Sequence, residues 1–562
     1  MSTNVSKQKR KDLTDKIKKI HKYIAGAKPD ENTRNLLTWL FELEKEINAK
    51  KFGLVFEEHR EAIDETLETH IPVLTENKKL FIDNGSQVNF LIEGDNLAAL
   101  QLLLKTHKGK IDLIYIDPPY NTGNKTWKYN NDYINKDDAF RHSKWLSFMK
   151  CRLLLARKLL KETGIFVCAI DDYEFSGLKL LIDELFSEQN RLATIIVVHN
   201  PGGRQDEKFF PTAHEYMLVY GKNILKSNVN TLSLSEEKIA QYTSQDKFGK
   251  YKLRGFRRSG ANSRRQDRPN LYYPIYYNTQ TGELTIEKKA NFIKLLPIDA
   301  DNTERCWRWN SKTFMEKQVK YIEVRKRNDN FDLYVKERED DNIGERAKTI
   351  WHKPKYASVG GTSMLKSLFN TSEKIFDYPK SLDLMLDIIK VTSNSNSIIL
   401  DFFAGSGTTG HAVMELNQDG GNRQFILCTN NENNICRDVT YKRLTNAIEK
   451  EDYSASLKYY KIDYIPIKDK LYYEYADKLL EHIRELVELE NAINFIGNDK
   501  ISIVLTDEEM DGFVKNIKKY KNCRKLYRAH NVLVSGNQSE VLKTAGIKTI
   551  VIPDYYYGEM GI

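Results

Sequence analysis

The motif Asp117-Pro118-Pro119-Tyr120 contains the residue types best suited to chemistry in this sequence. It ends the apolar run IDLIYID at 111–117, which predicts a buried strand. The Asp117 carboxylate and the Pro118 carbonyl can accept hydrogen bonds from both protons of an amino group, and consecutive prolines fix that carbonyl by holding φ at about −65°. Tyr120 offers a ring on which an extruded base can stack. The motif therefore suits a reaction at the weakly nucleophilic exocyclic amine of a nucleobase; the alternative is a rigid turn at a strand end.

A second motif, Asp401-Phe402-Phe403-Ala404-Gly405-Ser406-Gly407, ends the apolar strand predicted at 397–403. A strand, a glycine turn and a helix in succession let the backbone approach a ligand closely. An acid at the strand end suits the cationic ammonium and sulfonium groups of S-adenosylmethionine. We therefore expect this cofactor to be bound by Asp401, Phe403, Gly405 and Gly407. The alternative is an ordinary strand-to-helix turn.

The two motifs resemble those of adenine-N6 DNA methyltransferases with permuted motif order, especially the modification subunits of Type III restriction systems. The resemblance covers about residues 80–450 and rests on EGDNLAAL (93–100), DPPYNTG (117–123), SKWLSFMKCRLLLARKLL (143–160), HEYMLVY (214–220), RPNLYYPIYYN (268–278), YPKSLDLMLDII (378–389) and DFFAGSGTTGHAV (401–413). It implies direct methyl transfer from S-adenosylmethionine to N6 of an adenine flipped out of duplex DNA. It also implies a homodimer, a restriction-modification or phage-defence system, and a possible separate restriction subunit.

The resemblance further implies how the strands are arranged. The D-P-P-Y strand and the glycine strand should lie side by side at the topological switch point, whichever comes first in the chain. Asp95 would end the third strand and approach the cofactor's adenine, although it could equally cap the helix predicted at 96–107. At the end of the strand at 424–429 no residue matches the usual ribose ligand, because Glu432 lies too far along. The ribose contact therefore stays unassigned.

Alternation of apolar strands with amphipathic helices predicts an α/β fold, with a Rossmann-like, mostly parallel methyltransferase sheet. The predicted strands are 88–95, 111–117, 164–171, 193–199, 215–221, 397–403 and 424–429. The predicted helices are 35–47, 96–107, 144–161, 174–186 and 381–391. We expect a helical N-terminal extension (1–80), the two methyltransferase halves (81–224 and 356–460), a target-recognition insert between them (225–355), and a C-terminal part (461–562). That last part should hold a helix at about 470–494 and a small α/β domain with strands at 501–506, 531–535 and 548–553.

Basic residues are concentrated within the predicted insert, at 247–268. This segment holds nine Lys or Arg and one Asp, so its charge is 9 − 1 = +8, against +9 for the whole chain. Such a run suits contact with DNA phosphates, and arginines can also read guanine edges. We expect double-stranded DNA to contact Lys247, Lys250, Lys252, Arg257, Arg258, Arg264 and Arg265. A solvated loop is the alternative.

Other features exclude further functions. No cysteine follows a proline, which argues against cytosine-C5 methylation, and neither a P-loop nor a His-Glu-x-x-His zinc motif occurs, so no metal is expected. Six scattered cysteines, the absence of a secretory signal and the absence of a long apolar run predict a cytoplasmic protein outside membranes. The remaining alternatives are N4-cytosine methylation, whose enzymes more often carry Ser in place of Asp117, methylation of RNA or protein amides, and a non-catalytic DNA-specificity subunit. The sequence gives neither the target site nor the presence of a restriction partner.

Overall fold

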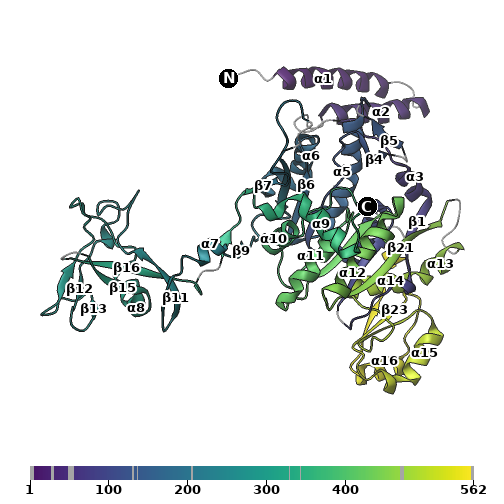
Figure 1. Ribbon diagram of the computed structural model, residues 1–562. Coiled ribbons are helices and arrows are strands. Elements are labelled where there is room, and N and C mark those ends of the chain that lie inside the picture. The colour runs from purple at the N-terminus through teal and green to yellow at the C-terminus, as the bar shows by residue number, and fades with distance from the viewer. Residues whose placement is uncertain are drawn as a thin grey trace. The chain divides into compact units, whose positions relative to one another are not determined.

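A computed structural model describes residues 5–26, 31–48, 56–85, 87–129, 132–135, 137–203, 207–327, 330–341, 344–468 and 474–557. The chain divides into two compact units (Figure 1). The larger unit combines Met1–Val229 with Lys348–Ile562, and the smaller unit is Asn230–Ala347. The smaller unit thus lies inside the segment 225–355 where the sequence predicts an insert.

A ten-stranded, mostly parallel sheet organises the larger unit, with the order β1-β21-β2-β20-β19-β3-β6-β8-β7-β18. From β21 to β6 all neighbouring strands run parallel, whereas β8 is antiparallel to both β6 and β7, and β1 is antiparallel to β21. The strands are β1 (His70–Glu76), β2 (Val88–Glu93), β3 (Ile111–Ile116), β6 (Leu160–Ile170), β7 (Arg191–Val198), β8 (His214–Gly221), β18 (Ile350–Trp351), β19 (Ile398–Asp401), β20 (Gln424–Thr429) and β21 (Ser456–Pro466).

Helices cover this sheet and bury its central strands on both faces. These strands are therefore continuous apolar runs in the sequence. The helices are α4 (Asn96–His107), α5 (Arg141–Leu159), α6 (Phe175–Ile182), α9 (Ser358–Phe369), α10 (Leu382–Thr392), α11 (Thr408–Leu416) and α12 (Lys442–Lys450). The apolar faces of α4, α5 and α6 share one core with the strands, which includes the fully buried Phe90, Leu103, Ile114, Phe166, Leu400 and Ile426. The helices α9, α10, α11 and α12 also carry buried apolar residues. A hairpin of β4 (Asn124–Tyr129) and β5 (Asp132–Asn135) follows β3 in the chain.

Three strands of the main sheet, β1, β18 and β21, were not predicted. The segment assigned to a helical extension does hold α1 (Val5–Ala25), α2 (Glu31–Asn48) and α3 (Ala62–Thr69), but β1 follows and pairs with β21. Ile71, Val73 and Leu74 are buried there. Likewise β18 falls within the predicted insert yet pairs with β7. All three strands need a partner from a distant part of the chain, so local periodicity does not reveal them.

The C-terminal part corrects two predictions. The long helix is divided at His482 into α13 (Ala476–Glu481) and α14 (Ile483–Asn491), while residues 470–473 of its predicted range lie outside the described residues. A parallel sheet of β22 (Ile501–Val504), β23 (Lys525–Arg528) and β24 (Lys548–Val551) follows, with α15 (Asp507–Lys515) and α16 (Gly536–Thr544). The strand predicted at 531–535 is wrong. β23 takes its place because Leu526 and Tyr527 are buried, whereas Leu533 is 79% exposed.

The smaller unit is built from antiparallel strands around its own aromatic core. One sheet has the order β10-β11-β16-β15 and another β13-β12-β14. Phe256 stacks on Trp307 and packs against Phe314 at the centre of this core. Its elements are β9 (Thr231–Leu232), α7 (Glu236–Ile239), β10 (Ser244–Asp246), β11 (Gly249–Gly255), β12 (Ile275–Tyr277), β13 (Leu284–Thr285), β14 (Ile293–Leu295), α8 (Ser311–Tyr321), β15 (Ile322–Arg327), β16 (Asn330–Arg338) and β17 (Glu345–Arg346).

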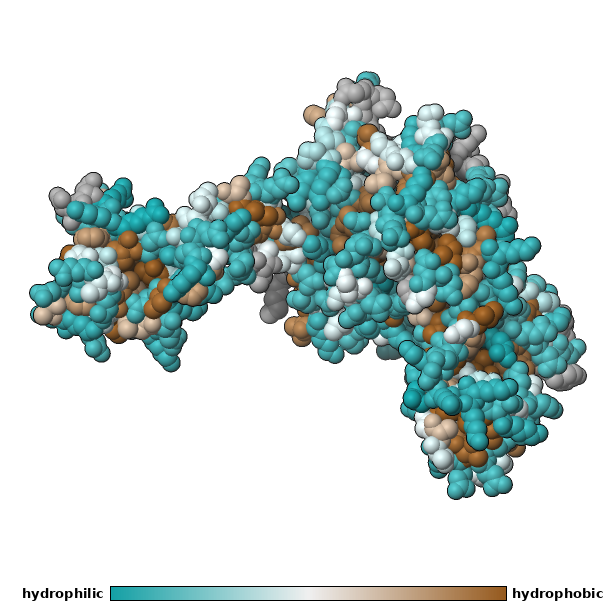
Figure 2. Space-filling view, turned by 60° about the horizontal axis from the view of Figure 1, so that its bottom comes forward, coloured by the Kyte–Doolittle hydropathy of each residue, from teal (hydrophilic) through white to brown (hydrophobic). Residues whose placement is uncertain are grey.

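The surface in Figure 2 is mainly hydrophilic, and apolar residues lie in several separate areas among polar ones. Among the described residues, none of the helices combines the length and the apolar character needed to span a membrane.

Candidate active site

The two motifs meet at one edge of the main sheet. β3, which leads into Asp117, pairs in parallel with β19, which ends at Asp401, through Leu113 with Ile399 and Ile114 with Leu400. Because both strands run in the same direction, the residues that follow them leave the sheet at the same edge. β2 and β20 end there too, since they lie next in the sheet order. The topology therefore brings together the segments that the sequence predicted to be adjacent.

The D-P-P-Y turn is held by side chains from the neighbouring helices. The indole Nε1 of Trp145 on α5 donates a hydrogen bond of 2.7 Å to the Pro119 carbonyl. The next residue, Asn121, has a φ of 55°, and its amide donates to the Glu174 carboxylate at 2.5 Å. The Pro118 carbonyl, in contrast, receives no hydrogen bond from the part of the chain that the structure describes. The turn is thus fixed, and the carbonyl of the buried Pro118 keeps its capacity to accept a hydrogen bond unused within the described residues.

Four polar side chains gather around the end of this turn. The Tyr120 hydroxyl lies 2.7 Å from Oδ1 of Asp117 and 3.0 Å from Oε2 of Glu215. The Lys380 ammonium lies 2.6 Å from the Tyr120 hydroxyl, 2.6 Å from Glu215 Oε2 and 3.3 Å from Asp117 Oδ1. Glu215 lies at the start of β8, and Lys380 precedes α10. We call Asp117, Tyr120, Glu215 and Lys380 the D-Y-E-K cluster.

The charges of the D-Y-E-K cluster influence one another strongly. Burial raises the pKa of Asp117, the Lys380 ammonium opposes that rise, and the negative charge of Glu215 adds to it. Burial also acts to raise the pKa of Glu215, but Lys380 outweighs it, so the pKa of Glu215 is lowered. The pKa of Lys380 is raised because the two carboxylates outweigh its burial. With two carboxylates and one ammonium ionised, the cluster carries a net charge of −2 + 1 = −1.

The glycine motif forms a tight turn at the end of β19. Burial raises the pKa of Asp401 to about 7, and its carboxylate accepts hydrogen bonds from the Phe403 amide at 2.9 Å and the Thr409 hydroxyl at 2.5 Å. Gly405 and Gly407 have φ values of 48° and 78°, in the left-handed region that favours glycine. The Asp401 side chain thus holds the turn together.

Asp95 and Phe403 border the same edge. Asp95 caps α4, because its carboxylate accepts a 2.7 Å hydrogen bond from the Leu97 amide, and it also lies 3.6 Å from the buried Arg152 guanidinium. The structure therefore bears out its capping interpretation and leaves its cofactor contact a prediction. The Phe403 ring packs against Phe148 of α5.

The charged side chains at this edge of the main sheet suit a cationic ligand that lies next to an amine. Asp95, Asp117, Asp401 and Glu215 bring four carboxyl groups to the strand ends, and Lys380 and Arg152 are cations that contact them. The glycine turn adds backbone that carries no side chain at Gly405 and Gly407. This chemistry matches the positively charged sulfonium and ammonium of S-adenosylmethionine.

Comparison with known sequences now decides the family. Residues 111–442 match the DNA methylase family. The chain is a DNA methylase.

Two relatives place this DNA methylase further. The Type II methyltransferase M.KpnI of Klebsiella pneumoniae is 39% identical over 352 residues, which is 62% of this chain and 82% of that protein. The Type III restriction-modification enzyme EcoPI Mod subunit of Escherichia phage P1 is 33% identical over 384 residues, which is 62% of this chain but only 58% of that protein. The PvuII DNA methyltransferase (cytosine-N4-specific) aligns with 65% of this chain and 93% of its own, at a TM-score of 0.32 and 11% identity, a likeness too weak to bear on the chemistry.

The predicted basic residues of this DNA methylase differ in how they are engaged. Arg265 forms two hydrogen bonds with Glu304, Arg257 donates to the Ile298 carbonyl, and Lys252 donates to Gln241. Within the described ranges, no acidic side chain pairs with the remaining four, which are Lys247, Lys250, Arg258 and Arg264. These four keep their donors available for a polyanion.

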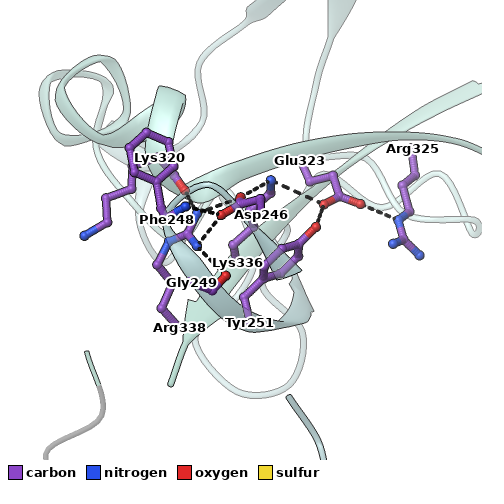
Figure 3. Close-up of polar contacts among 9 residues, drawn as sticks. All are labelled: Asp246, Phe248, Gly249, Tyr251, Lys320, Glu323, Arg325, Lys336 and Arg338. Atoms are coloured by element: carbon purple, nitrogen blue, oxygen red, sulfur yellow. Dashed lines mark hydrogen bonds and ion pairs between the residues drawn. The ribbon is translucent and has the colours of Figure 1, made fainter. Parts of the chain in front are cut away.

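Neighbouring cations of the smaller unit are committed to a network that joins its strands (Figure 3). Asp246 accepts hydrogen bonds from both terminal nitrogens of Arg338 and from Lys336, and its pKa is strongly lowered by these partners. Glu323 accepts from the Tyr251 hydroxyl and from Arg325. Because such charge-assisted bonds hold β10, β15 and β16 together, Lys336 and Arg338 serve the fold rather than a ligand.

The sequence reasoning missed Glu215 and Lys380. Both lie in stretches quoted for the family resemblance, HEYMLVY and YPKSLDLMLDII, yet neither received a role. The available signal was a carboxylate at the start of an apolar strand and a lysine beside a proline at a helix start. Only the fold brings these residues to Asp117.

Proposed function

We propose that this DNA methylase transfers the methyl group of S-adenosylmethionine to N6 of adenine in duplex DNA. The observation that carries the proposal is the pairing of the Asp117 carboxylate with the available Pro118 carbonyl at a rigid turn beside the glycine loop. Two acceptors with this spacing in the chain suit the two protons of an exocyclic amine. Serine, which N4-cytosine methylases more often carry at the Asp117 position, is absent here.

The residues would act on the amine as follows. The bound cofactor supplies an electrophilic methyl group on a cationic sulfur. Asp117 and the Pro118 carbonyl accept hydrogen bonds from the two N6–H groups and thereby direct the nitrogen lone pair towards that methyl group. With the cofactor bound, the nitrogen–carbon bond would form as the carbon–sulfur bond breaks and leaves its electron pair on sulfur. The methylated amine would then pass one proton to solvent through its hydrogen bond with the Asp117 carboxylate. Stacking of the extruded adenine on Tyr120 would contribute about 1–3 kcal/mol towards flipping it out of the helix.

Residues of the strand ends would hold the cofactor. We assign Asp401, Gly405 and Gly407 to the loop that receives its methionine part, Phe403 to the wall of this loop, and Asp95 to the side of its adenine. What supports the assignment is the group of carboxylates at this edge and the tight glycine turn, whose left-handed φ values at Gly405 and Gly407 favour residues without a side chain.

Analysis of the methylated nucleosides tests the proposal. Duplex plasmid DNA is incubated with the enzyme and S-adenosylmethionine and then digested to nucleosides. Mass spectrometry of the digest should detect N6-methyl-2′-deoxyadenosine. The Asp117→Ala enzyme provides the background measurement for the same preparation. N4-methylcytosine as the product would overturn the adenine assignment, and no methylated base on any duplex would overturn the function.

We also propose that the smaller unit, Asn230–Ala347, reads the target sequence. Its own core makes it a separate body, and it presents Lys247, Lys250, Arg258 and Arg264, which pair with no acidic side chain in the described ranges. The relation to the EcoPI Mod subunit supports a place in a restriction-modification system with a separate restriction subunit. The homodimer stays a prediction.

Replacing Lys247 and Lys250 by Ala should weaken binding to all duplex DNA about equally. Neither lysine pairs with an acid in the described part of the chain, and each phosphate contact contributes about −0.9 to the slope of log affinity against log salt. We therefore expect the slope to become shallower by about one per lysine. Fluorescence anisotropy with specific and unrelated duplexes at several salt concentrations measures it.

The matched control replaces two exposed lysines of the larger unit, Lys78 and Lys79, by Ala. This variant should keep the wild-type slope. An unchanged slope in Lys247→Ala/Lys250→Ala would show that DNA contacts lie elsewhere.

A further inference from the structure

We propose that Lys380 and Glu215 are positioning residues that hold Asp117 and Tyr120 in the geometry needed to receive the substrate amine. This inference rests on the proposed function, since it concerns how the same acceptor is prepared. It assigns a role to two residues outside the D-P-P-Y and glycine motifs.

The contacts of Lys380 are directed to this one place. Its ammonium has three protons and lies within 3.3 Å of three oxygens, those of Tyr120, Glu215 and Asp117. The Lys380 side chain is only 13% exposed and that of Glu215 only 4%. Burying an ammonium group costs free energy unless carboxylates surround it. The contacts of Lys380 with Glu215 and Asp117 offset this cost.

Lys380 and Glu215 come from rigid elements on both sides of the turn. Glu215 lies in β8, where it pairs with Val197 of β7, and β8 is hydrogen-bonded on its other side to β6. Lys380 directly precedes Ser381, which caps α10 and donates a 2.7 Å hydrogen bond to the Lys355 carbonyl. The two charges are therefore fixed by the fold, and Asp117 and Tyr120 are oriented by them.

This arrangement leaves one acceptor of Asp117 for the substrate. Tyr120 and Lys380 both contact Oδ1 of Asp117, and the described part of the chain donates no hydrogen bond to Oδ2. Oδ2 and the Pro118 carbonyl are then the two acceptors that face an incoming amine. The Tyr120 hydroxyl, which has a single proton, is held between Asp117 and Glu215, and this fixes its ring as well.

The Glu215 carboxylate explains why Lys380 does not neutralise the charge of Asp117. A lone Lys380–Asp117 pair would have no net charge and would weaken Asp117 as an acceptor. Because Glu215 shares the ammonium, the cluster keeps a net charge of −1, which favours a reaction that brings in a cation and releases a proton. Asp401, Tyr115 and Cys168 are further titratable groups whose charges interact with Asp117, and His199 interacts with Glu215.

Opposite charge changes at the two positions provide the test. The rate constant kcat should fall at low pH as Asp117 is protonated. Lys380→Met removes a positive charge, so the pKa of Asp117 rises and this fall moves to higher pH. Glu215→Gln removes a negative charge, so the fall moves to lower pH. We also expect kcat at neutral pH to decrease about a hundredfold in Lys380→Met, the cost of misplacing a reacting group.

The measurement is single-turnover methylation of a duplex across about pH 5 to 9, a range chosen to include perturbed carboxyl groups. Lys380→Arg, which keeps the charge, should return the pH profile towards wild type, and Lys374→Met, at an exposed lysine nearby in the sequence, should match wild type. Affinity for S-adenosylmethionine should stay within about twofold of wild type in every variant, because the pair faces the amine side of the site.

A shift in the same direction for both variants, or no shift in either, would overturn the proposal and make the pair a purely structural ion pair. If Lys380→Met fails to fold, as judged by thermal melting, the isosteric Glu215→Gln decides alone, and an unmoved profile overturns the proposal. Failure of the proposed function is distinguishable, since wild-type enzyme would then give no methylated adenine whatever the variants do.

Discussion

An Asp117→Ala enzyme is expected to lose at least about a thousandfold in kcat while binding S-adenosylmethionine with nearly wild-type affinity. The carboxylate accepts an amine proton most strongly as positive charge develops on the nitrogen, so its loss raises the transition state more than the ground state. A thousandfold corresponds to about 4 kcal/mol. Transfer of a labelled methyl group to duplex DNA under single-turnover conditions measures the rate, and calorimetric titration measures cofactor affinity.

The matched control is Asp463→Ala, at an aspartate of β21 that pairs with Lys461 near the surface. It should methylate at the wild-type rate. Two results would contradict the assignment of Asp117. A near-normal rate in Asp117→Ala would mean that it is not the acceptor, and an equal loss of rate and cofactor affinity would place it with the cofactor instead.

Much of the main sheet could be predicted because its strands are buried on both faces. Apolar runs such as 111–117 and 424–429 identify β3 and β20 without any partner being known. The helix predicted at 96–107 is α4 with the same bounds, since Asp95 provides a capping signal in the sequence itself. The family resemblance implied the neighbouring positions of the two motif strands, and the structure has them side by side at an edge where parallel sheets bind ligands.

The remaining features depend on contacts between distant segments. Tyr120 and Lys380 are 260 residues apart, and only the sheet order brings them together. The strand at 525–528 was missed because Lys525 and Arg528 flank its two buried residues and conceal the apolar signal. Likewise, a charge count cannot show that Arg265 is paired with Glu304 while Arg264 is not paired with an acid in the described part of the chain.

Gly405→Val should reduce affinity for S-adenosylmethionine by at least about a hundredfold, or about 3 kcal/mol. Gly405 has a φ of 48°, and a side chain in this region costs roughly 1–2 kcal/mol before any contact is considered. A Cβ there would also lie 3.3 Å from the Phe376 ring, and the two methyl groups of valine would approach further. The turn must therefore shift, and the backbone that would face the methionine part of the cofactor shifts with it. Calorimetric titration with S-adenosylmethionine measures the loss.

A matched control separates strain from loss of the cofactor site. Gly420 has a φ of 83°, and no atom of the described residues lies within 4 Å of the place that a Cβ would take, so Gly420→Val imposes left-handed strain without a contact. Gly420 lies in the turn between α11 and β20, before β20 begins and therefore away from the carboxyl ends of the strands, where the candidate site lies. We expect its variant to lose thermal stability but to keep its affinity for S-adenosylmethionine. Equal affinity for S-adenosylmethionine in Gly405→Val and the wild type would remove the glycine turn from the cofactor site. Equal loss of affinity in both variants would attribute the effect to general destabilisation, and only a loss confined to Gly405→Val supports the turn as the place where the methionine part binds.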